Sequence, residues 1–296
     1  MSILVCDEAW GPVRLGGRLQ SAPGCERLVV VVHGLGGCSE SHYAKRVARA
    51  AFEAGLSCLR LGLRGADLSG EDIYHAGLTA DLEAVVASDL LSSYKDLFIL
   101  GYSLGGHLAL RYAAGRVDER VRAVAAVCAP LDLARAVEAF DRQARRPYRW
   151  HVMSSLRTMY APVARRRRWA PPVSEVNGIR TIREWDERVV APRFGFRDAL
   201  DYYERTSVGP RLRELTVPAL LVASRSDPMV FHETLRPSLL DAPERLDVRW
   251  VSRGGHVGFP GGLDLGEPGP RGLESQVLAW LTSGSRSPNR RRGQAR

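Results

Sequence analysis

Short apolar runs alternate with longer segments of helical spacing along most of this chain. Val, Leu and Ala dominate the runs, which cover residues 28–32, 57–61, 97–100, 121–127, 219–223 and 246–251. Apolar residues recur with the period of a helix in the segments 43–54, 78–91, 105–114 and 273–281. An unbroken apolar run is typical of a strand that is covered on both faces. The pattern therefore predicts an α/β fold, with helices flanking a mostly parallel central sheet.

The alternation stops between Pro130 and Ser207. This stretch has no Val/Ile run, but it holds several aromatic residues and helical patterns over 131–144 and 149–160, with a break at Pro171-Pro172. A helical segment between two sheet strands is typical of a cap. We therefore predict a core made of residues 1–130 and 207–284, with a helical cap insertion over 131–206.

Composition narrows the class of protein. A chain of 296 residues with 45% hydrophobic residues can bury a large core. No apolar stretch reaches the ~18 to 20 residues of a membrane-spanning helix, and Met1 to Cys6 do not resemble a secretory signal. The five cysteines are odd in number and form no Cys-x-x-Cys pair, which argues against a disulfide framework and against a zinc site. We expect a cytoplasmic protein without a metal.

The net charge of +9 is unevenly distributed. Residues 285–296 hold five arginines and no acid, and without them 37 basic residues face 33 acidic ones, which is an ordinary surface balance. We predict that this basic tail is disordered and inert, and that the run Arg165 to Arg168 is an exposed face of a helix or loop. Nucleic acid is therefore not an expected partner, whereas peripheral contact with anionic lipid stays open.

The segment Gly101-Tyr-Ser-Leu-Gly-Gly106 carries the sharpest chemical signal. It lies directly after the predicted strand 97–100 and directly before a predicted helix. Gly-x-Ser-x-Gly between a strand and a helix is the nucleophile elbow, in which glycines leave room for a strained turn that exposes the serine. The helix that follows directs its N-terminal amides at developing negative charge. This setting predicts Ser103 as a catalytic nucleophile rather than as an ordinary turn residue.

A serine hydroxyl needs a base to remove its proton and an acid to orient that base. In folds with a nucleophile elbow, the acid and the histidine follow the serine in the chain. Of the seven histidines, only His232 and His256 lie downstream of the predicted cap. His256 lies in a glycine-rich loop after the run 246–251 and is the predicted base, whereas His232 stands at the start of a predicted helix on the surface.

Asp227 is the predicted acid. It follows the run 219–223 and therefore lies just past the carboxyl end of a buried strand, where catalytic groups gather in open α/β sheets. An aspartate before proline is also common in ordinary turns. Asp247 is nearer to His256 in the chain but falls inside a predicted strand, and it is the weaker choice.

Two backbone amides are expected to form an oxyanion hole. One is the amide of Leu104, the residue after the nucleophile, and the other is the amide of Leu35 in the loop His33-Gly-Leu-Gly-Gly37. A dinucleotide-binding loop is the rival interpretation of the second segment. Its third glycine position is Ser39, so the fingerprint is incomplete.

Taken together, these motifs resemble the YheT-like branch of the α/β-hydrolases, AB hydrolase family 4. The resemblance covers roughly residues 28 to 282 and rests on the loop 33–37, the elbow 101–106 and the segment Gly254-Gly-His-Val-Gly-Phe259. Further matching stretches are Leu63-Arg-Gly65, Ser69-Gly-Glu71, Ile73-Tyr-His75, Trp185-Asp186, Ala191-Pro192, Gly195-Phe196, Asp201-Tyr-Tyr203, Ser207, Pro218 and Ser226-Asp-Pro228.

The resemblance implies a Ser-His-Asp hydrolase with Ser103, His256 and Asp227 as the catalytic residues. It also implies an esterase or lipase that acts on a small-molecule acyl ester or a lipid through an acyl-enzyme intermediate, without a cofactor. Two alternatives stay open. A thioesterase, acyltransferase or amidase would use the same triad, and a non-catalytic binding protein could retain the same fold.

Overall fold

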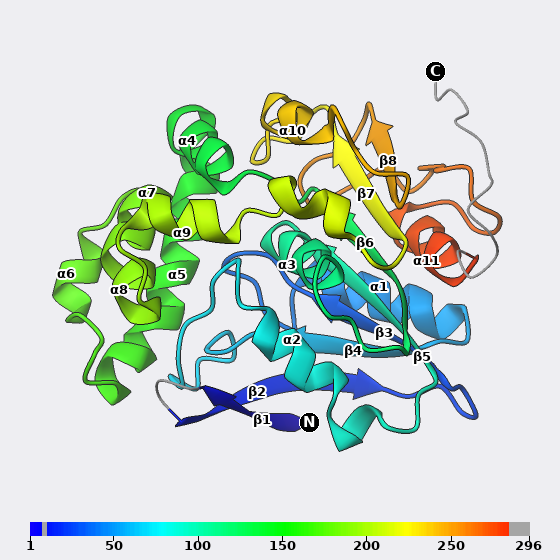
Figure 1. Cartoon of the computed structure of the whole chain (residues 1–296), viewed down its shortest axis with the longest axis horizontal. Helices are drawn as coiled ribbons and strands as arrows, with labels where there is room; N and C mark the ends of the chain where they lie inside the picture. Colours follow the sequence, from blue (N-terminus) through cyan, green and yellow to red (C-terminus); the bar gives the residue numbers. More distant parts are fainter. Residues whose placement is uncertain (8–10, 284–296) are drawn as a thin grey trace.

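One central sheet organises the molecule in the computed structural model, which describes residues 1–7 and 11–283 (Figure 1). Within these residues the sheet has eight strands in the order β1-β2-β4-β3-β5-β6-β7-β8. β2 is antiparallel to both β1 and β4, and all the other neighbours are parallel. The strands are β1 (Ser2–Asp7), β2 (Gly11–Gln20), β3 (Arg27–Val32), β4 (Ser57–Gly62), β5 (Asp96–Tyr102), β6 (Val121–Val127), β7 (Ala219–Ser224) and β8 (Leu246–Val251).

The six parallel strands coincide with the six predicted apolar runs. β6 and β8 have the predicted ends, and the other four differ by one or two residues at one or both ends. β7 is buried at every position, and β3 at every position after Arg27. Such strands need apolar side chains on both faces, and for this reason the unbroken runs identify them. The predicted α/β fold with a mostly parallel sheet is confirmed.

The antiparallel pair β1–β2 was not predicted. In β2, Val13 and Leu15 are fully buried while Arg14 between them is exposed, so only one face of this strand is covered. Gly16 and Gly17 then interrupt the alternation of apolar and polar residues. A half-covered strand interrupted by glycine has a weak sequence signal.

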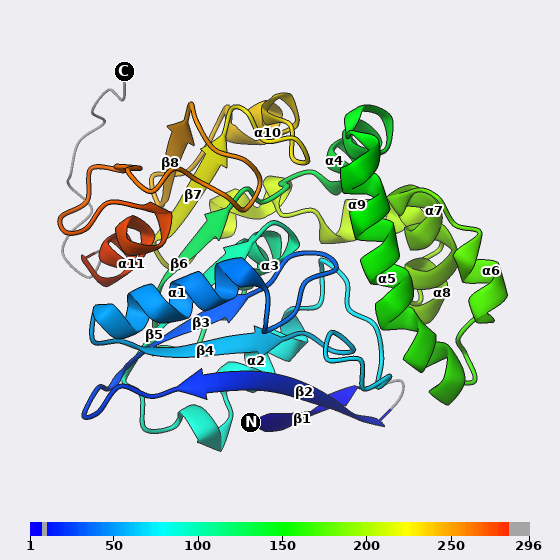
Figure 2. The ribbon, with the colours of Figure 1, turned by 180° about the vertical axis from the view of Figure 1, so that it is seen from behind.

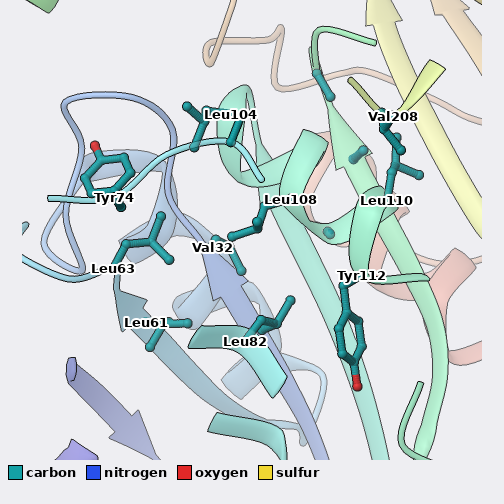
Figure 3. Close-up of a cluster of buried hydrophobic side chains, with 14 of the residues drawn as sticks. Val32, Leu61, Leu63, Tyr74, Leu82, Leu104, Leu108, Leu110, Tyr112 and Val208 are labelled. Carbon is teal, nitrogen blue, oxygen red and sulfur yellow. The ribbon is translucent and has the colours of Figure 1, made fainter. Parts of the chain in front are cut away.

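Helices cover both faces of the sheet, as Figures 1 and 2 show from opposite sides. α1 (His42–Glu53) and α11 (Leu273–Ser283) pack on one face, whereas α2 (Thr79–Val86) and α3 (Leu104–Ala113) pack on the other. Figure 3 shows the layer beneath α3, where Val32 of β3 and Leu108 of α3 lie close together and are both fully buried. This layer supports the turn at which α3 begins.

The helix predicted over 78–91 is divided in two. α2 ends at Val86, and a separate 3-10 turn covers Asp89–Leu91. Ser88 lies between them and donates its hydroxyl proton to the carbonyl oxygen of Val85 at 2.7 Å. A serine that bonds to the preceding turn competes with the helical backbone, which explains the early end of α2.

A group of helices lies between β6 and β7, beside the carboxyl ends of the parallel strands (Figure 1). The predicted helices over 131–144 and 149–160 correspond to α4 and α5, and α5 is longer than predicted at both ends. The group between β6 and β7 consists of α4 (Leu133–Gln143), α5 (Arg146–Arg166), α6 (Val173–Asn177), α7 (Ile182–Trp185), a π-helical turn (Asp186–Val190), α8 (Ala191–Phe194) and α9 (Ala199–Thr206). We call this group the helical segment. The division of the chain into core and cap stays a prediction, and the predicted basic tail lies outside the described residues.

The two ends of the helical segment lie side by side on α3. The ring nitrogens of His107 lie 2.7 Å from the carbonyl oxygen of Pro130 and 2.9 Å from that of Thr206. Arg111, one turn further along α3, donates to the same Thr206 oxygen at 3.1 Å. The amide of Gly209 also donates to the carbonyl oxygen of Leu131 at 2.8 Å. The helix that follows the elbow therefore holds both ends of the segment.

A buried ion cluster joins the helical segment to the rest of the molecule. Nε of Arg193, in α8, donates to Asp72 at 2.8 Å, and Nη1 of Arg64 donates to the same carboxylate at 3.0 Å. Arg64 also binds Asp81 of α2. All four side chains are almost completely buried. In the described part of the chain, no helix combines the length and the apolar character needed to cross a membrane.

Candidate active site

Ser103 stands on a sharp turn between β5 and α3. Its backbone adopts φ 53° and ψ −122°, a strained conformation for a residue with a side chain. A Cβ at Gly101 would lie 2.1 Å from the carbonyl oxygen of Gly105, and a Cβ at Gly105 would lie 2.4 Å from that of His33. The turn therefore tolerates only glycine on both sides of Ser103, as the elbow motif requires.

His256 and Asp227 form a direct hydrogen bond. Nδ1 of His256 lies 2.9 Å from one carboxylate oxygen of Asp227 and 3.1 Å from the other. Asp227 follows β7 and His256 follows β8, so the carboxyl ends of two neighbouring strands bring them together. The amides of Met229 and Val230 donate to the Asp227 carboxylate at 2.8 and 3.0 Å and fix its orientation.

The Asp227 carboxylate is stabilised in its charged form. Burial alone would raise the pKa of Asp227, but the charge of His256 and the hydrogen bonds from His256, Val230 and Met229 outweigh burial and hold that pKa below its ordinary value. An ionised carboxylate can only accept hydrogen bonds, so Nδ1 of His256 is the donor. Nε2 of the neutral ring is then the nitrogen that can accept a proton.

The structure brings Ser103 next to the glycine loop rather than into a hydrogen bond with the histidine. A Cβ at Gly34 would lie 3.0 Å from Cβ of Ser103 and 3.6 Å from its Oγ. In the described part of the chain, no hydrogen bond joins Oγ of Ser103 to His256. Such contacts are often long in unliganded active sites and shorten when substrate binds.

Two tyrosines fix the loop that precedes α1. The amide of Gly34 donates to Oη of Tyr43 at 3.0 Å, and the amide of Gly36 donates to Oη of Tyr74 at 2.7 Å. The amide of Gly37 bonds to the carbonyl oxygen of Gly34 at 3.0 Å. Three amides of the loop are thus committed to partners within the protein.

Two other amides near Ser103 keep their protons available. Among the described residues, neither the Leu35 amide nor the Leu104 amide donates a hydrogen bond. Leu104 is the first residue of α3, where no intrahelical acceptor exists. The two predicted oxyanion donors are therefore both free of partners within the described part of the chain.

His33 sets the position of the same loop, a role that sequence reasoning missed. Its Nε2 accepts from the amide of Leu63 at 3.1 Å, so Nδ1 carries the proton and donates to the carbonyl oxygen of Gly34 at 2.9 Å. Burial lowers the pKa of His33 to about 4, against a weaker upward effect of the Gly34 carbonyl. The ring is therefore neutral at physiological pH. The motif 33–37 contained this residue, but only the structure shows its two partners.

Cys128 lies against the acid–histidine pair and was also missed. Its thiol sulfur, a carboxylate oxygen of Asp227 and a ring nitrogen of His256 all lie within 4.8 Å of one another. Cys128 follows β6 with φ 49°, and burial, together with the charge of Asp227, raises the pKa of its thiol. The signal in the sequence is its position directly after the run 121–127. The Asp227–His256 hydrogen bond already occupies two of these potential ligand atoms, so we infer no metal from this set.

The rejected candidates have other partners. Asp247 binds Arg249 at 2.6 Å and accepts from the indole nitrogen of Trp280 at 3.1 Å. His232 begins α10 (His232–Leu239), as the sequence indicates, but it is half-buried and packs edge-on against Trp250 instead of lying free on the surface.

A cavity of about 460 Å³ lies between the helical segment and the loop of the acid. On one side it is lined by Gln143, Arg145 and Tyr148. The opposite side is formed by Ser226, Asp227, Pro228, Phe231 and Gly255. The helical segment thus forms one wall of a space that reaches Asp227.

Comparison with known proteins gives consistent matches. A family model described as "Alpha/beta hydrolase family" matches residues 29–262. The chain is 32% identical to "Putative esterase YheT" of Escherichia coli strain K12, covering 86% of this chain and 76% of that protein. It is 25% identical to "Monoacylglycerol lipase ABHD2" of Danio rerio and 28% identical to "Phospholipase ABHD3" of Mus musculus. These matches cover 86% and 79% of this chain but only 62% and 59% of the two relatives.

Solved structures show the same fold at low sequence identity. An esterase of Pyrococcus furiosus aligns with a TM-score of 0.55 at 14% identity, covering 87% of this chain and 84% of that one. A 2,6-dihydroxy-pseudo-oxynicotine hydrolase aligns with a TM-score of 0.60 at 16% identity, covering 96% and 67%.

Proposed function

Because this chain belongs to the alpha/beta hydrolase family and is a carboxylic ester hydrolase, we propose that it works through an acyl-enzyme formed on Ser103. His256 is the general base and Asp227 is the acid that orients it. The observation that carries this proposal is the Asp227–His256 hydrogen bond, next to a serine in elbow geometry. These groups come from the ends of three strands of one sheet.

The reaction has two steps. Nε2 of His256 takes the hydroxyl proton of Ser103 while Oγ attacks the acyl carbon, and the resulting imidazolium returns this proton to the departing alcohol. Water then attacks the acyl-enzyme, with His256 again as the base, and the acid is released. Asp227 stays ionised throughout and stabilises the imidazolium, in line with the low pKa of its carboxyl group.

Negative charge on the carbonyl oxygen is held by the amides of Leu35 and Leu104. Their availability supports this assignment, since the neighbouring loop amides are bound to tyrosines or to the loop itself. Donors fixed before the reaction need no reorganisation as charge develops, and removing one such donor typically costs ~3 to 4 kcal/mol.

The proposed substrate is a small-molecule acyl ester or a lipid. The printed names of the relatives support this class, and the cavity of about 460 Å³ can accommodate a group of moderate size. We also propose that the helical segment is the cap of the enzyme. For the compartment we propose the cytosol, since Cys25, Cys38, Cys58 and Cys128 are all free thiols.

Replacement of the nucleophile tests the proposal. Ser103→Ala should abolish both the hydrolysis of p-nitrophenyl esters and labelling by a fluorophosphonate, with little change in the melting temperature. Ser92→Ala, at an exposed serine directly after the 3-10 turn 89–91, is the matched control and should keep both activities. Labelling that persists in Ser103→Ala would contradict the assignment. Faster turnover of thioesters or amides than of matched esters would instead favour the alternative acyl-transfer chemistry.

A further inference from the structure

The start of α5, residues 145–150, combines arginines with exposed aromatic side chains. Trp150 is 70% exposed and Tyr148 is 37% exposed, which places both among the few large hydrophobic residues on the described surface. Arg145 and Arg146 are exposed beside them. Exposure of large aromatic side chains to water is energetically unfavourable. Their grouping with arginines therefore indicates a surface that binds a partner.

Charge in this region is strongly one-sided. Residues 142–168 contain nine arginines and no acidic residue. Some of these arginines are satisfied within the protein, since Arg142 pairs with Glu138 and Arg149 donates to the carbonyl oxygen of Asp141. Arg145 and Arg146 form no ion pair with any described residue. Their charges are free to meet an anionic partner.

The start of α5 also lies beside the cavity that reaches the candidate active site at Asp227. Arg145 and Tyr148 line the cavity that reaches Asp227. Two turns later, α5 contacts the glycine loop, where a Cβ at Gly36 would lie only 2.7 Å from Cβ of Ser155. A surface that meets the start of α5 would therefore lie next to the cavity that reaches Asp227.

We propose that the start of α5 docks the enzyme on an anionic lipid surface, with the cavity entrance turned towards the bilayer. The inference rests on the proposed function, because docking there delivers an acyl lipid to Ser103. Arginine guanidinium groups pair with lipid phosphates, and indole and phenol rings partition to the headgroup region. A nucleic acid would also attract the arginines, but an exposed tryptophan beside the cavity of an ester hydrolase fits a lipid surface better.

Vesicle sedimentation tests the docking. The full chain should bind vesicles of phosphatidylglycerol mixed with phosphatidylcholine, should bind pure phosphatidylcholine weakly, and should dissociate as NaCl rises from about 50 to about 500 mM. Trp150→Ala should weaken binding about tenfold. Arg146→Glu should weaken it about fivefold for each unit of charge. Neither residue lines the cavity, so turnover of a soluble ester should not change.

Helix α1, which does not line the cavity, provides a matched control. α1 carries an exposed Phe52 (55%) and an exposed Arg46, so the double variant Arg46→Glu/Phe52→Ala removes the same kinds of groups there. It should bind vesicles like the unaltered chain. Brominated lipid should also quench tryptophan fluorescence of the unaltered chain more than that of Trp150→Ala, which reports contact at this residue directly.

The outcomes separate the competing explanations. Absence of vesicle binding at low salt would overturn the proposal, as would equal binding by Trp150→Ala, Arg146→Glu and the control. Binding that is lost only when residues 285–296 are removed would assign it to the basic tail instead. Binding to single-stranded RNA that Arg146→Glu abolishes, without vesicle binding, would indicate a nucleic acid partner. Because Ser103→Ala can be used throughout, failure of the catalytic proposal leaves this test intact.

Discussion

At the scale of single residues, we predict contrasting effects on kcat for replacements of Asp227 and Asp247. Asp227→Asn should lower kcat by about 10⁴, because an amide cannot hold the His256 tautomer or stabilise the imidazolium. Asp247→Asn should affect kcat little, since Asp247 binds Arg249 and Trp280. Steady-state kinetics on a soluble ester measures both variants. The reverse ranking would assign the acid to Asp247.

His33 predicts a pH dependence of stability. Its pKa is about 4 in the folded chain, because of burial, against 6.5 for an ordinary histidine. Between these values the unfolded chain binds more protons than the folded one, so the free energy of unfolding should fall by about 3 kcal/mol as pH drops from 6.5 towards 4. Urea unfolding at several pH values measures this slope.

The matched variant for this slope is His33→Asn, which places a polar side chain with a donor and an acceptor at the position but does not titrate. Its pH dependence should be flatter by the same amount, although its stability at pH 7 is expected to be lower. An NMR titration of His33 with its midpoint near 6.5 would contradict this prediction, because it would show that burial does not lower the pKa of His33.

At the scale of elements, Asp186 in the π-helical turn predicts the opposite trend. Burial raises its pKa to about 8, against a weaker downward effect of the hydrogen bond with Tyr203 at 2.7 Å. The folded chain then keeps a proton that the unfolded chain loses near pH 4, so stability falls as pH rises from about 4 to about 8. Asp186→Asn still accepts from Tyr203 but does not ionise. Its stability relative to the unaltered chain should increase with pH over this range and become constant above it, as thermal melts at pH 5, 7 and 9 would show.

The attachment of the helical segment makes another prediction. Arg193→Met should destabilise the protein by about 3 to 5 kcal/mol, because it removes a partner of the buried Asp72 carboxylate. Arg188→Met, in the neighbouring π-helical turn, loses only exposed contacts to Glu175 and Glu184 and should cost less than about 1 kcal/mol. Urea unfolding measures the cost, and hydrogen exchange should show faster opening of α8 in Arg193→Met. Equal effects of the two variants would contradict the role of the buried cluster.

Elements with an apolar face on both sides were predictable from the sequence, and elements with one covered face were less so. β3 and β7, which are buried on both faces, matched their runs to within one residue, whereas β1 and β2 were missed because β2 alternates and then reaches two glycines. α5 extends to Arg166 although Pro162 lies inside it. Its packing on the loops at Gly36 and Gly70 overrides the local breaking signal of the proline.

The residues of the candidate site that lie in local sequence motifs were predictable from the sequence. Ser103 and His256 lie in glycine-rich segments, and Asp227 stands at a strand end, so each carried a local signal. The tyrosines that hold the loop amides carried none, because their role depends on contacts across 9 and 38 residues of chain. Cys128 was missed for the same reason, since its neighbours Asp227 and His256 are remote in the sequence. The catalytic roles themselves stay a prediction until Ser103→Ala is measured.

At the scale of the whole molecule, the basic tail should be dispensable for catalysis. Residues 285–296 contain five arginines and no residue that could join an apolar core. A chain that ends at Gly284 should keep its turnover on a soluble ester and its melting temperature. Loss of this activity on truncation would show that the tail contributes to the core or to the pocket.

The paired ends of the helical segment have a consequence for how such enzymes diversify. Since His107 and Arg111 hold Pro130 and Thr206 together, the chain between them begins and ends almost at a single point on α3. Lengthening a loop whose ends are already joined costs little, on the order of 0.6 kcal/mol for each doubling. Segments of different length and shape can thus be exchanged at this junction without disturbing the strand register. A graft at these two residues should therefore exchange one wall of the cavity while it leaves the sheet unchanged.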